Sequence, residues 1–468
     1  MDNELTALTT IFTEFYYWIT VVLMFLIHVG FCMYEVGASR YKHHQHTLMK
    51  NTMLIPLVTV TFFLFGWWIY WALPNGPGLA TSIMPDVGSG LILGGGFGAN
   101  EIANPTNALM AVNLGDHFYG VFWAAFLLFS WTAASIVSGA VIERITTFAF
   151  GICAIAIGSV FWTIDAAWGW HFDGWMLKIL GYHDAYASGV IHAVAGGFAL
   201  GILMVLGPRI GKFSSSGEPR NIGPRNPWLV AIGLFLIFTG FWGFYAACNI
   251  PIYDVGNPDD YAMGIQYWTA TNIYLTPTTL SGVTMNFLMS LSGGFLAGYV
   301  ISKGDPFWTY SSGLAGIIAA SAGNDLYHPI QAMIIAMIGV VVAYKMHYWV
   351  ERKFKIDDAV GAVAVHGYAG VAGLIMCGFV LNGYPSSGYS VGSMWVGTDY
   401  APINPLGMFI GAVIMFVVLG LIPGWIIAKI LHGMGKLRIP REVEIAGLDY
   451  NLLESARDDE KAVSSSTR

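Results

Sequence analysis

The sequence has little charge and few cysteines. Only 10% of its 468 residues are charged, whereas an ordinary soluble domain has about 25%. Hydrophobic residues make up 56% of the chain, and the mean hydropathy is +0.61. The formal net charge of −7 is accompanied by no basic tract, so nucleic-acid binding is not expected. This composition is typical of an integral membrane protein.

The four cysteines, Cys32, Cys153, Cys248 and Cys377, stand singly in apolar segments. Without a C-x-x-C pair they predict neither a disulfide framework nor a zinc site. A phosphate-binding loop is also missing, because the glycine-rich stretch at 94–98 lacks the following Lys and Ser or Thr. We therefore predict no cofactor, no metal and no enzymatic activity, and we do not expect primary active transport.

A window of about 20 residues finds eleven apolar spans, and the predicted fold is an all-α integral membrane protein with eleven transmembrane helices. Acidic residues precede the first span, so we expect a retained helix rather than a cleaved signal. We predict a membrane domain over residues 1–433 and a cytoplasmic tail over residues 434–468. The spans start near residues 12, 53, 117, 147, 184, 228, 275, 308, 327, 358 and 407.

Loop charge predicts the orientation, because Lys and Arg concentrate on the cytoplasmic side of membrane proteins. Basic residues follow the first, third, fifth, seventh and ninth spans, among them Lys50, Arg144 and Arg209. The intervening loops hold a single basic residue, Lys178. We predict a multi-pass protein of the cell membrane, surrounded by lipid, with an extracellular or periplasmic N-terminus and a cytoplasmic C-terminus.

Two distant segments share one layout: D-A-Y-A-S-G-V-I-H from Asp184 to His192, and D-A-V-G-A-V-A-V-H from Asp358 to His366. Ala-Gly follows each at the same offset. At about 1.5 Å of rise per residue, each histidine lies ~12 Å deeper than its acid, near the middle of a ~30 Å hydrocarbon core. The segments enter from opposite faces in the predicted topology. This indicates two inverted five-helix repeats plus a C-terminal helix, with a site at the midplane.

Ionisable groups inside a membrane are costly and usually line a pathway. Two facing imidazoles, His192 and His366, could share a proton and pass small polar molecules. Two alternatives are buried histidines satisfied by serine or carbonyl partners, and axial haem ligands; the latter is weaker because each helix offers one such histidine. Asp184 and Asp358 are predicted to cap helix N-termini. Asp184 is also a candidate for setting the electrostatics of an outer cation site, and Asp358 for ordering the cytoplasmic entrance.

These segments resemble the ammonium transporter (Amt/Rh/methylammonium permease) family over nearly the whole chain. So do S-G-A-V-I-E-R at the end of the third span, F-W-G-F-Y-A-A-C in the sixth and G-F-C-M-Y-E-V-G-A-S-R-Y-K in the first. The resemblance implies a homotrimer that transports ammonium or ammonia, and methylammonium, with one pore in each protomer. It makes His192 and His366 the twin pore histidines, Phe129 and Phe244 the gate, and Asp184 the structural aspartate.

The resemblance also implies an outer vestibule in which Trp170 contacts the recruited cation. The family's vestibule serine is replaced by Cys248, a weaker hydrogen-bond partner. A neighbouring asparagine is Tyr245, and the outer phenylalanine is Ala125 with Phe126 alongside. These departures affect the outer cation site and leave the pore intact. Outside this resemblance, the tryptophan would be interpreted as an interfacial belt residue and the gate phenylalanines as core packing.

An aromatic vestibule attracts ammonium and potassium alike through ring faces. Only ammonium can lose its charge, and burying an unpaired ion in an apolar channel costs many kcal/mol. The expected activity is therefore recruitment of ammonium, deprotonation, and passage of ammonia past the histidines.

The altered vestibule and a modified tail keep a second function open, an ammonium sensor with little or no conduction. In the tail, the family's G-L-D segment is present at Gly447 to Asp449, but the His-Gly that normally follows is missing. Retention of G-L-D favours coupling between protomers, and a PII-type signalling protein is the candidate regulator.

Overall fold

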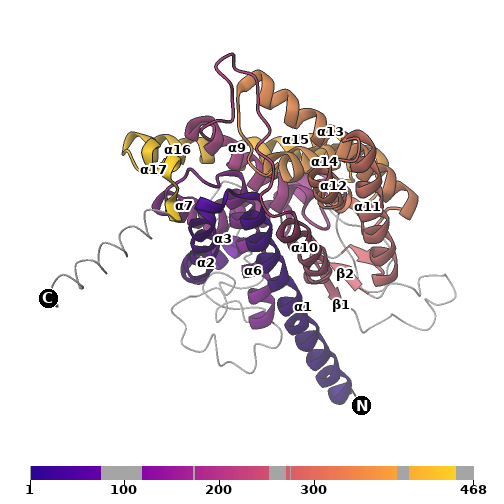
Figure 1. The fold of residues 1–468 in the computed structure, drawn as a ribbon. Coiled ribbons are helices and arrows are strands. Elements are labelled where there is room, and N and C mark those ends of the chain that lie inside the picture. Colours follow the sequence, from indigo (N-terminus) through magenta and orange to yellow (C-terminus); the bar gives the residue numbers. More distant parts are fainter. Residues whose placement is uncertain are drawn as a thin grey trace.

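The apolar runs of the sequence form long helices that pack against one another (Figure 1). In this computed structural model the described residues are 2–74, 119–171, 174–251, 270–274, 276–386 and 400–449. Residues 75–118, which include the glycine-rich stretch at 94–98, residues 252–269 and 387–399, and the tail beyond residue 449 lie outside them. The sequence predictions that fall there stay predictions.

The α-helices differ in length and alternate with short π-helical and 3-10 turns. The α-helices are α1 (Asp2–Ala38), α2 (His44–Thr61), α3 (Trp67–Ala72), α6 (Tyr119–Ala140), α7 (Thr147–Ala156), α8 (Trp162–Gly169), α9 (Val194–Leu206), α10 (Pro227–Ala247), α11 (Leu280–Ile301), α12 (Pro306–Ala320), α13 (Pro329–Phe354), α14 (Ala369–Val380), α15 (Pro405–Val413), α16 (Ile422–Gly433) and α17 (Arg441–Ala446). The π turns are η2 (Phe62–Gly66), η5 (Ile157–Phe161), η6 (Met176–Leu180), η7 (Ser188–Ala193), η10 (Val363–Tyr368) and η11 (Ile414–Leu421), and the 3-10 turns are η1 (Tyr41–His43) and η9 (Ser321–Gly323).

Within the described ranges, ten helical segments are long and apolar enough to cross a membrane. The predicted span near residue 308 is also a helix, α12, but at 15 residues it is shorter than the others. The predicted helical membrane fold is therefore confirmed. It carries one small addition, an antiparallel sheet of β1 (Asn249–Pro251), β2 (Ala270–Asn272) and β3 (Pro277–Thr278), in which Ile250 pairs with Thr271 and Ala270 with Thr278.

The second helix begins earlier than the sequence indicated. Helix α2 starts at His44, whereas the predicted span starts near residue 53. Lys50 therefore lies within a helix, fully buried, and its Nζ donates to the Ser138 carbonyl at 2.7 Å and lies 3.6 Å from Glu35 Oε2. The prediction that Lys50 belongs to a loop was wrong, because a paired lysine can be accommodated inside a helical bundle.

Several helices start at a polar residue followed by proline. Asn226, Asp305 and Asn404 each accept a backbone N–H of their first helical turn, and proline follows each of them. The side chain satisfies a free N–H group, and proline at the first helical position loses no hydrogen bond. These local signals fix where α10, α12 and α15 begin.

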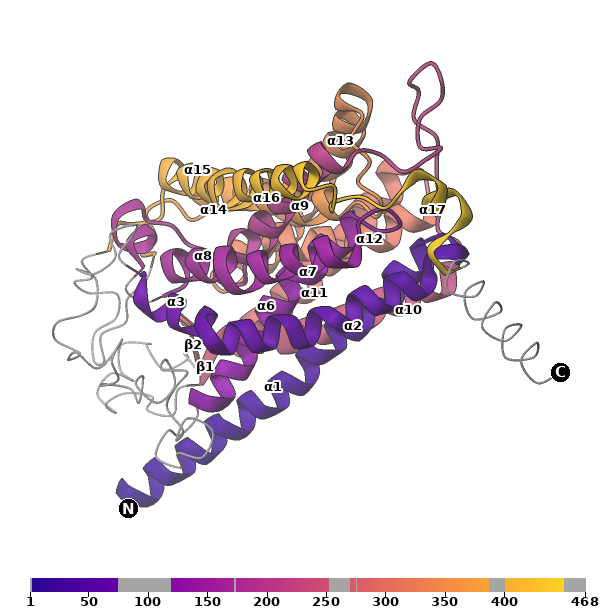
Figure 2. The same cartoon turned by 90° about the vertical axis from the view of Figure 1, so that its left-hand side faces the viewer.

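The amino-terminal end of α1 and the short helix α17 lie at opposite ends of the bundle (Figure 2). We call the end with β1 and β2 the outer end and the end with α17 the inner end.

Candidate functional site

His192 and His366 lie in direct contact although 174 residues separate them. Their Nδ1 atoms are 3.0 Å apart, so one ring donates its proton to the other. The ring centroids are 5.1 Å apart. His192 is fully buried, and His366 is 3% exposed. The two predicted pore residues are thus brought together inside the protein.

Each histidine lies on a π-helical turn, His192 on η7 and His366 on η10. Such turns are rare and occur frequently at functional sites. Among the described residues, no hydrogen-bond partner reaches His192 Nε2.

Glycines of the repeated Ala-Gly pair allow the two helices to cross closely. A Cβ on Gly196, four residues after His192, would lie 2.4 Å from the Gly367 nitrogen. A Cβ on Gly370, four residues after His366, would lie 2.2 Å from the Ser188 carbonyl oxygen. In each repeat, the glycine four residues after the histidine therefore lies against the backbone of the other repeat. This reciprocal contact places the histidines side by side.

Asp184 holds the start of the first repeat's helix. Its Oδ1 accepts the Ser188 N–H at 2.7 Å, and its Oδ2 accepts the N–H groups of Gly189 and Val190 at 2.8 and 2.9 Å. The Tyr182 hydroxyl donates to Oδ2 at 3.1 Å. The carboxylate is fully occupied in capping η7, the geometry expected from the sequence.

Asp358 occupies the corresponding position in the second repeat but is held less firmly. Its Oδ2 accepts the Ala364 N–H at 3.2 Å and lies 3.7 Å from His347 Nδ1. Its Oδ1 has no hydrogen-bond partner among the described residues. The side chain lines an inner-end cavity of about 290 Å³, together with His347, Trp308 and Tyr348.

Phe129 and Phe244, the predicted gate, contact each other, and Phe244 also contacts His192. Their ring centroids are 4.8 Å apart with planes at 84°, and the Phe244 ring stacks on the His192 ring at 5.7 Å. Phe126 meets Phe129 edge-on at 5.7 Å. All three phenylalanines are fully buried. The three phenylalanine rings form a buried cluster that contacts His192 through Phe244.

The predicted vestibule residues Trp170 and Cys248 lie next to Phe129 and Phe244. Trp170 is fully buried, its Nε1 donates to the Asp184 carbonyl at 2.6 Å, and its ring lies 5.1 Å from Phe129. It therefore does not occupy a lipid-facing belt position. Cys248 is buried, and its thiol donates to the Phe244 carbonyl at 3.2 Å.

Tyr245, one of the departures, is engaged within the protein. Its ring stacks on Tyr186 with centroids 4.1 Å apart and planes at 8°. Its hydroxyl is 2.7 Å from Ser321 Oγ and accepts from Asn324 Nδ2 at 2.9 Å. Ala125, another of the departures, is fully buried. Tyr245 thus packs against Tyr186 and hydrogen-bonds to Ser321 and Asn324.

Sequence reasoning passed over Glu35, which is fully buried in α1. Its Oε2 accepts from Ser138 Oγ at 2.7 Å and from Asn51 Nδ2 at 2.9 Å, and Lys50 Nζ lies 3.6 Å away. The signal was present, because an ionisable residue within an apolar run of membrane length is unusual. Glu35 lies within the segment G-F-C-M-Y-E-V-G-A-S-R-Y-K, which we considered only for its resemblance to the family.

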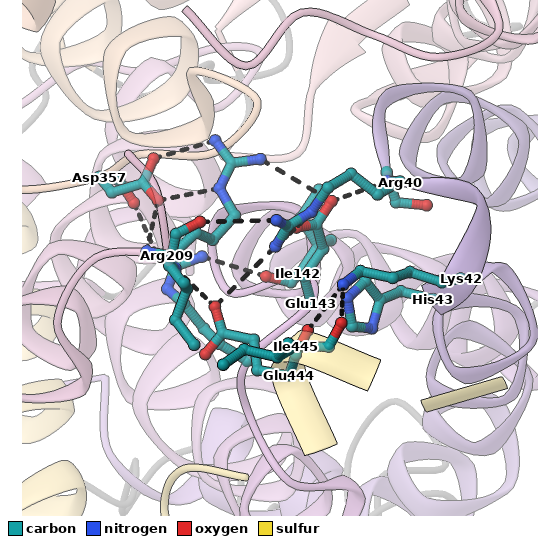
Figure 3. Close-up of polar contacts among 12 residues, drawn as sticks. Arg40, Lys42, His43, Ile142, Glu143, Arg209, Asp357, Glu444 and Ile445 are labelled. Carbon is teal, nitrogen blue, oxygen red and sulfur yellow. Dashed lines mark hydrogen bonds and ion pairs between the residues drawn. The ribbon is translucent and has the colours of Figure 1, made fainter. Parts of the chain in front are cut away.

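A network of ion pairs ties the helix ends together at the inner end (Figure 3). Glu143 accepts the backbone N–H and the Nε of Arg40 at 2.7 and 2.6 Å. Asp357 accepts the backbone N–H, Nε and Nη2 of Arg209 at 2.9, 2.8 and 3.0 Å. Arg209 also lies 4.0 Å from Glu143. We call these four residues the inner network.

Burial raises the pKa of the Glu143 carboxyl, but Arg209 and Arg40 outweigh this effect and hold the pKa below its ordinary value. Burial also raises the pKa of Asp357, and Arg209 together with Arg144 lowers it far more strongly. Both carboxyls therefore stay ionised at neutral pH. Their charges compensate the buried arginines.

The first part of the predicted tail is attached to this network. Glu444 accepts the Ile210 N–H at 2.7 Å and pairs with Arg438 at 2.7 Å, and Lys42 donates to the Glu444 and Ile445 carbonyls (Figure 3). In the G-L-D segment, Asp449 accepts the Gln45 N–H at 3.0 Å at the start of α2. G-L-D therefore caps a helix of its own chain.

The geometry opposes the haem alternative, because the direct Nδ1–Nδ1 contact leaves no room for iron between the rings. The part of the chain that the structure describes also contains no group of three or more His, Cys, Asp or Glu residues suited to a metal ion.

Known proteins resemble the chain over nearly its full length. The model of the Ammonium Transporter Family matches residues 15–457. Ammonium transporter Amt2 of Methanocaldococcus jannaschii is 30% identical over 96% of this chain and 91% of that protein. Ammonium transporter Amt1 of the same organism is 26% identical over 92% and 93%.

Solved structures share the fold. A structure titled "Sensor Amt Protein" has a TM-score of 0.73 at 22% identity and covers 96% of this chain and 99% of its own. Candida albicans Mep2 has a TM-score of 0.63 at 15% identity, with 92% and 86% covered. The helical arrangement and the extended sequence match lead to one conclusion: this multi-pass membrane protein belongs to the ammonium transporter family.

Proposed function

We propose that this protein moves ammonium across the membrane by recruiting it among Trp170, Phe126 and Cys248, removing its proton, and passing ammonia along His192 and His366. Membership of the family supports ammonium transport as the activity. The family consists of transporters rather than enzymes. The direct contact of the two imidazoles beside the Phe129–Phe244 pair is the observation that carries the pathway.

The physical case rests on charge. Around His192 the walls are rings and aliphatic groups, where an unpaired cation would cost many kcal/mol. Ammonia is neutral and can both donate and accept hydrogen bonds. His192 Nε2, without a partner in the described part of the chain, supplies one such contact. Potassium cannot lose its charge and is excluded at the same point.

The vestibule is proposed as a cation site of aromatic faces, each contact worth about 0.5 to 2 kcal/mol. Trp170 and Phe126 supply the faces. Cys248 stands at the position of a hydroxyl in the resemblance and is a weaker partner. We therefore expect recruitment with modest affinity, and methylammonium as a second substrate.

A sensor with little or no conduction is not favoured. The likeness to the structure titled "Sensor Amt Protein" is at 22% identity and supports the fold alone. The curated relatives named above are transporters.

We further propose the cell membrane as location, the N-terminus outside and the inner end in the cytoplasm, because the loops at the inner end carry the basic residues. A transporter domain over residues 1–433 and a tail over 434–468 remain the proposed division. A homotrimer and a PII-type regulator are the proposed partners. Cross-linking in native membranes tests the trimer, and nucleotide-dependent pull-down tests the regulator.

Labelled-methylammonium uptake by the full chain in proteoliposomes tests the function. His192→Ala and His366→Ala should each change uptake by about tenfold or more, because they remove the hydrogen-bonding groups of the apolar passage. Trp228→Ala, at a residue 77% exposed on α10, is the control expected to behave as wild type. Unaltered uptake in both histidine variants would contradict the assigned pathway.

A further inference from the structure

Beside the histidine pair, on the inner side, lies a small cavity that adjoins the larger inner-end cavity. His366, Phe31, Tyr34, Glu35 and Gly139 are among its lining residues. About 10 Å³ is available to the centre of a water molecule, roughly the room that one water requires. Both cavities share the same three residues, Ser311, Val360 and Val365. The two cavities therefore share a wall, and together they extend from His366 past Glu35 toward the inner end.

Glu35 has one unsatisfied carboxylate oxygen. Its Oε2 is occupied by Ser138 and Asn51, whereas its Oε1 has no hydrogen-bond partner among the described residues. A Cβ on Gly139 would lie 3.7 Å from Glu35 Oε1 and 2.9 Å from Val360. Glu35, Gly139 and Val360 all line the cavity, and Oε1 is the Glu35 oxygen on the Gly139 side. Glycine at position 139 leaves this space open.

The surroundings suit a group that gains and loses a proton. A fully buried carboxylate with one unsatisfied oxygen is costly, and the buried ammonium of Lys50 at 3.6 Å offsets part of that cost. The hydroxyl of Tyr34, on the same cavity, lies 3.2 Å from Ser311 Oγ and donates to the Val360 carbonyl at 3.0 Å. In a purely structural ion pair, both buried carboxylate oxygens would be expected to have hydrogen-bond partners.

We propose that Glu35 is the proton acceptor on the inner side of the His192–His366 pair, so that ammonia and its proton leave the histidines by separate groups. The inference rests on the proposed function. Ammonium gives its proton to the imidazole pair and continues as ammonia. The proton passes from His366 through one water to Glu35 Oε1, which becomes a carboxylic acid. Glu35 then returns the proton to water in the inner cavity, and the carboxylate is restored.

The test separates charge from ammonia in proteoliposomes containing the full chain. Currents on a solid-supported membrane after an ammonium pulse report the proton, and an internal pH dye reports neutral ammonia as alkalinisation. Glu35→Gln keeps size and polarity but cannot accept the proton. It should lower the current about tenfold or more while ammonia-driven alkalinisation persists.

Three further variants distinguish the proton-acceptor role of Glu35 from a purely structural role. Ser138→Ala removes a hydrogen bond to the same carboxylate but leaves it titratable, and should keep the current within about threefold, the loss of one net hydrogen bond. Glu35→Asp should recover part of the current. The double variant Glu35→Gln with Lys50→Met removes both charges, and serves if the single variant is poorly folded.

The outcomes separate the two proposals. If a folded Glu35→Gln variant gives the same current as the wild-type protein, the role of Glu35 is overturned. Equal loss of current and alkalinisation in Glu35→Gln and Ser138→Ala overturns it too, in favour of a structural role. Wild-type alkalinisation without current overturns the proton route but leaves ammonia transport standing. A wild-type protein that moves neither contradicts the proposed function itself.

Discussion

The two repeats use the same Asp-to-His spacing but hold their aspartates differently. Asp184 accepts three backbone N–H groups and a tyrosine hydroxyl. Asp358, at the matching position, accepts a single N–H, and its Oδ1 has no hydrogen-bond partner among the described residues. The residue lines the inner-end cavity. In the second repeat the firmly bound acid is its neighbour Asp357, which accepts three N–H groups of Arg209.

The difference shows that sequence spacing locates the histidines better than it locates the residue that anchors each helix. At the outer end, the acid that begins the Asp-to-His segment also holds the start of the helix. At the inner end these roles fall to adjacent residues, which leaves Asp358 beside His347 at the cavity. The inner-end cavity therefore has a carboxylate and an imidazole in its lining.

Removing the firmly held acids should have the largest effect. Asp184→Ala and Asp357→Ala leave several buried donors unpaired, and each should destabilise the protein by about 3 kcal/mol or more. Asp358→Ala should cost about 1 kcal/mol, the value of one net hydrogen bond. Thermal unfolding of the three purified variants compares them. Equal losses at Asp357 and Asp358 would contradict the division of roles.

Substitutions of the two glycines that contact the opposite repeat should have similar effects, unlike substitutions of the two aspartates. Gly196→Ala and Gly370→Ala each place a methyl group against the backbone of the other repeat, and should cost about 1–3 kcal/mol by overpacking. Both should also impair uptake, because the histidines are pushed apart. Gly433→Ala, where a Cβ meets nothing within 4 Å, is the control. Different behaviour of the two variants would break the proposed symmetry.

A substitution at the outer end should have a smaller effect, an improvement in the apparent affinity for ammonium. Cys248→Ser supplies a stronger hydrogen-bond partner for a recruited cation, and should improve the apparent affinity for ammonium roughly fivefold, equivalent to about 1 kcal/mol. Concentration dependence of uptake measures it. Cys32→Ser, outside the vestibule, should leave affinity unchanged. An unchanged affinity in Cys248→Ser would show that the vestibule thiol does not meet the cation.

Acidic pH should reduce the stabilisation that the inner network gives to the fold, whereas pH changes near neutrality should have little effect on it. Because the folded-state pKa values of Glu143 and Asp357 are depressed, their stabilisation is fully present above the ordinary carboxyl pKa of about 4 and is lost as pH falls below it. Unfolding temperature measured from pH 7 down to acid should therefore fall first below about pH 4. Asp357→Asn should flatten that dependence, and an equally steep fall in this variant would assign it to other groups.

Much of this architecture could be predicted from the sequence. Apolar length identified the helices, and repeated spacing identified the contact between His192 and His366. Charge counting misplaced Lys50, because its partner Glu35 comes from another helix and only packing reveals the pair. The unequal binding of Asp357 and Asp358 was equally hidden, since it depends on where Arg209 lies in space.

The most direct test of the account is the response of the reconstituted wild-type protein to matched pulses of ammonium and potassium. The account predicts an ammonium-evoked current that is abolished in the His192→Ala, His366→Ala double variant, and no current with potassium. Equal responses to the two cations, or an ammonium current that survives loss of both histidines, would contradict it.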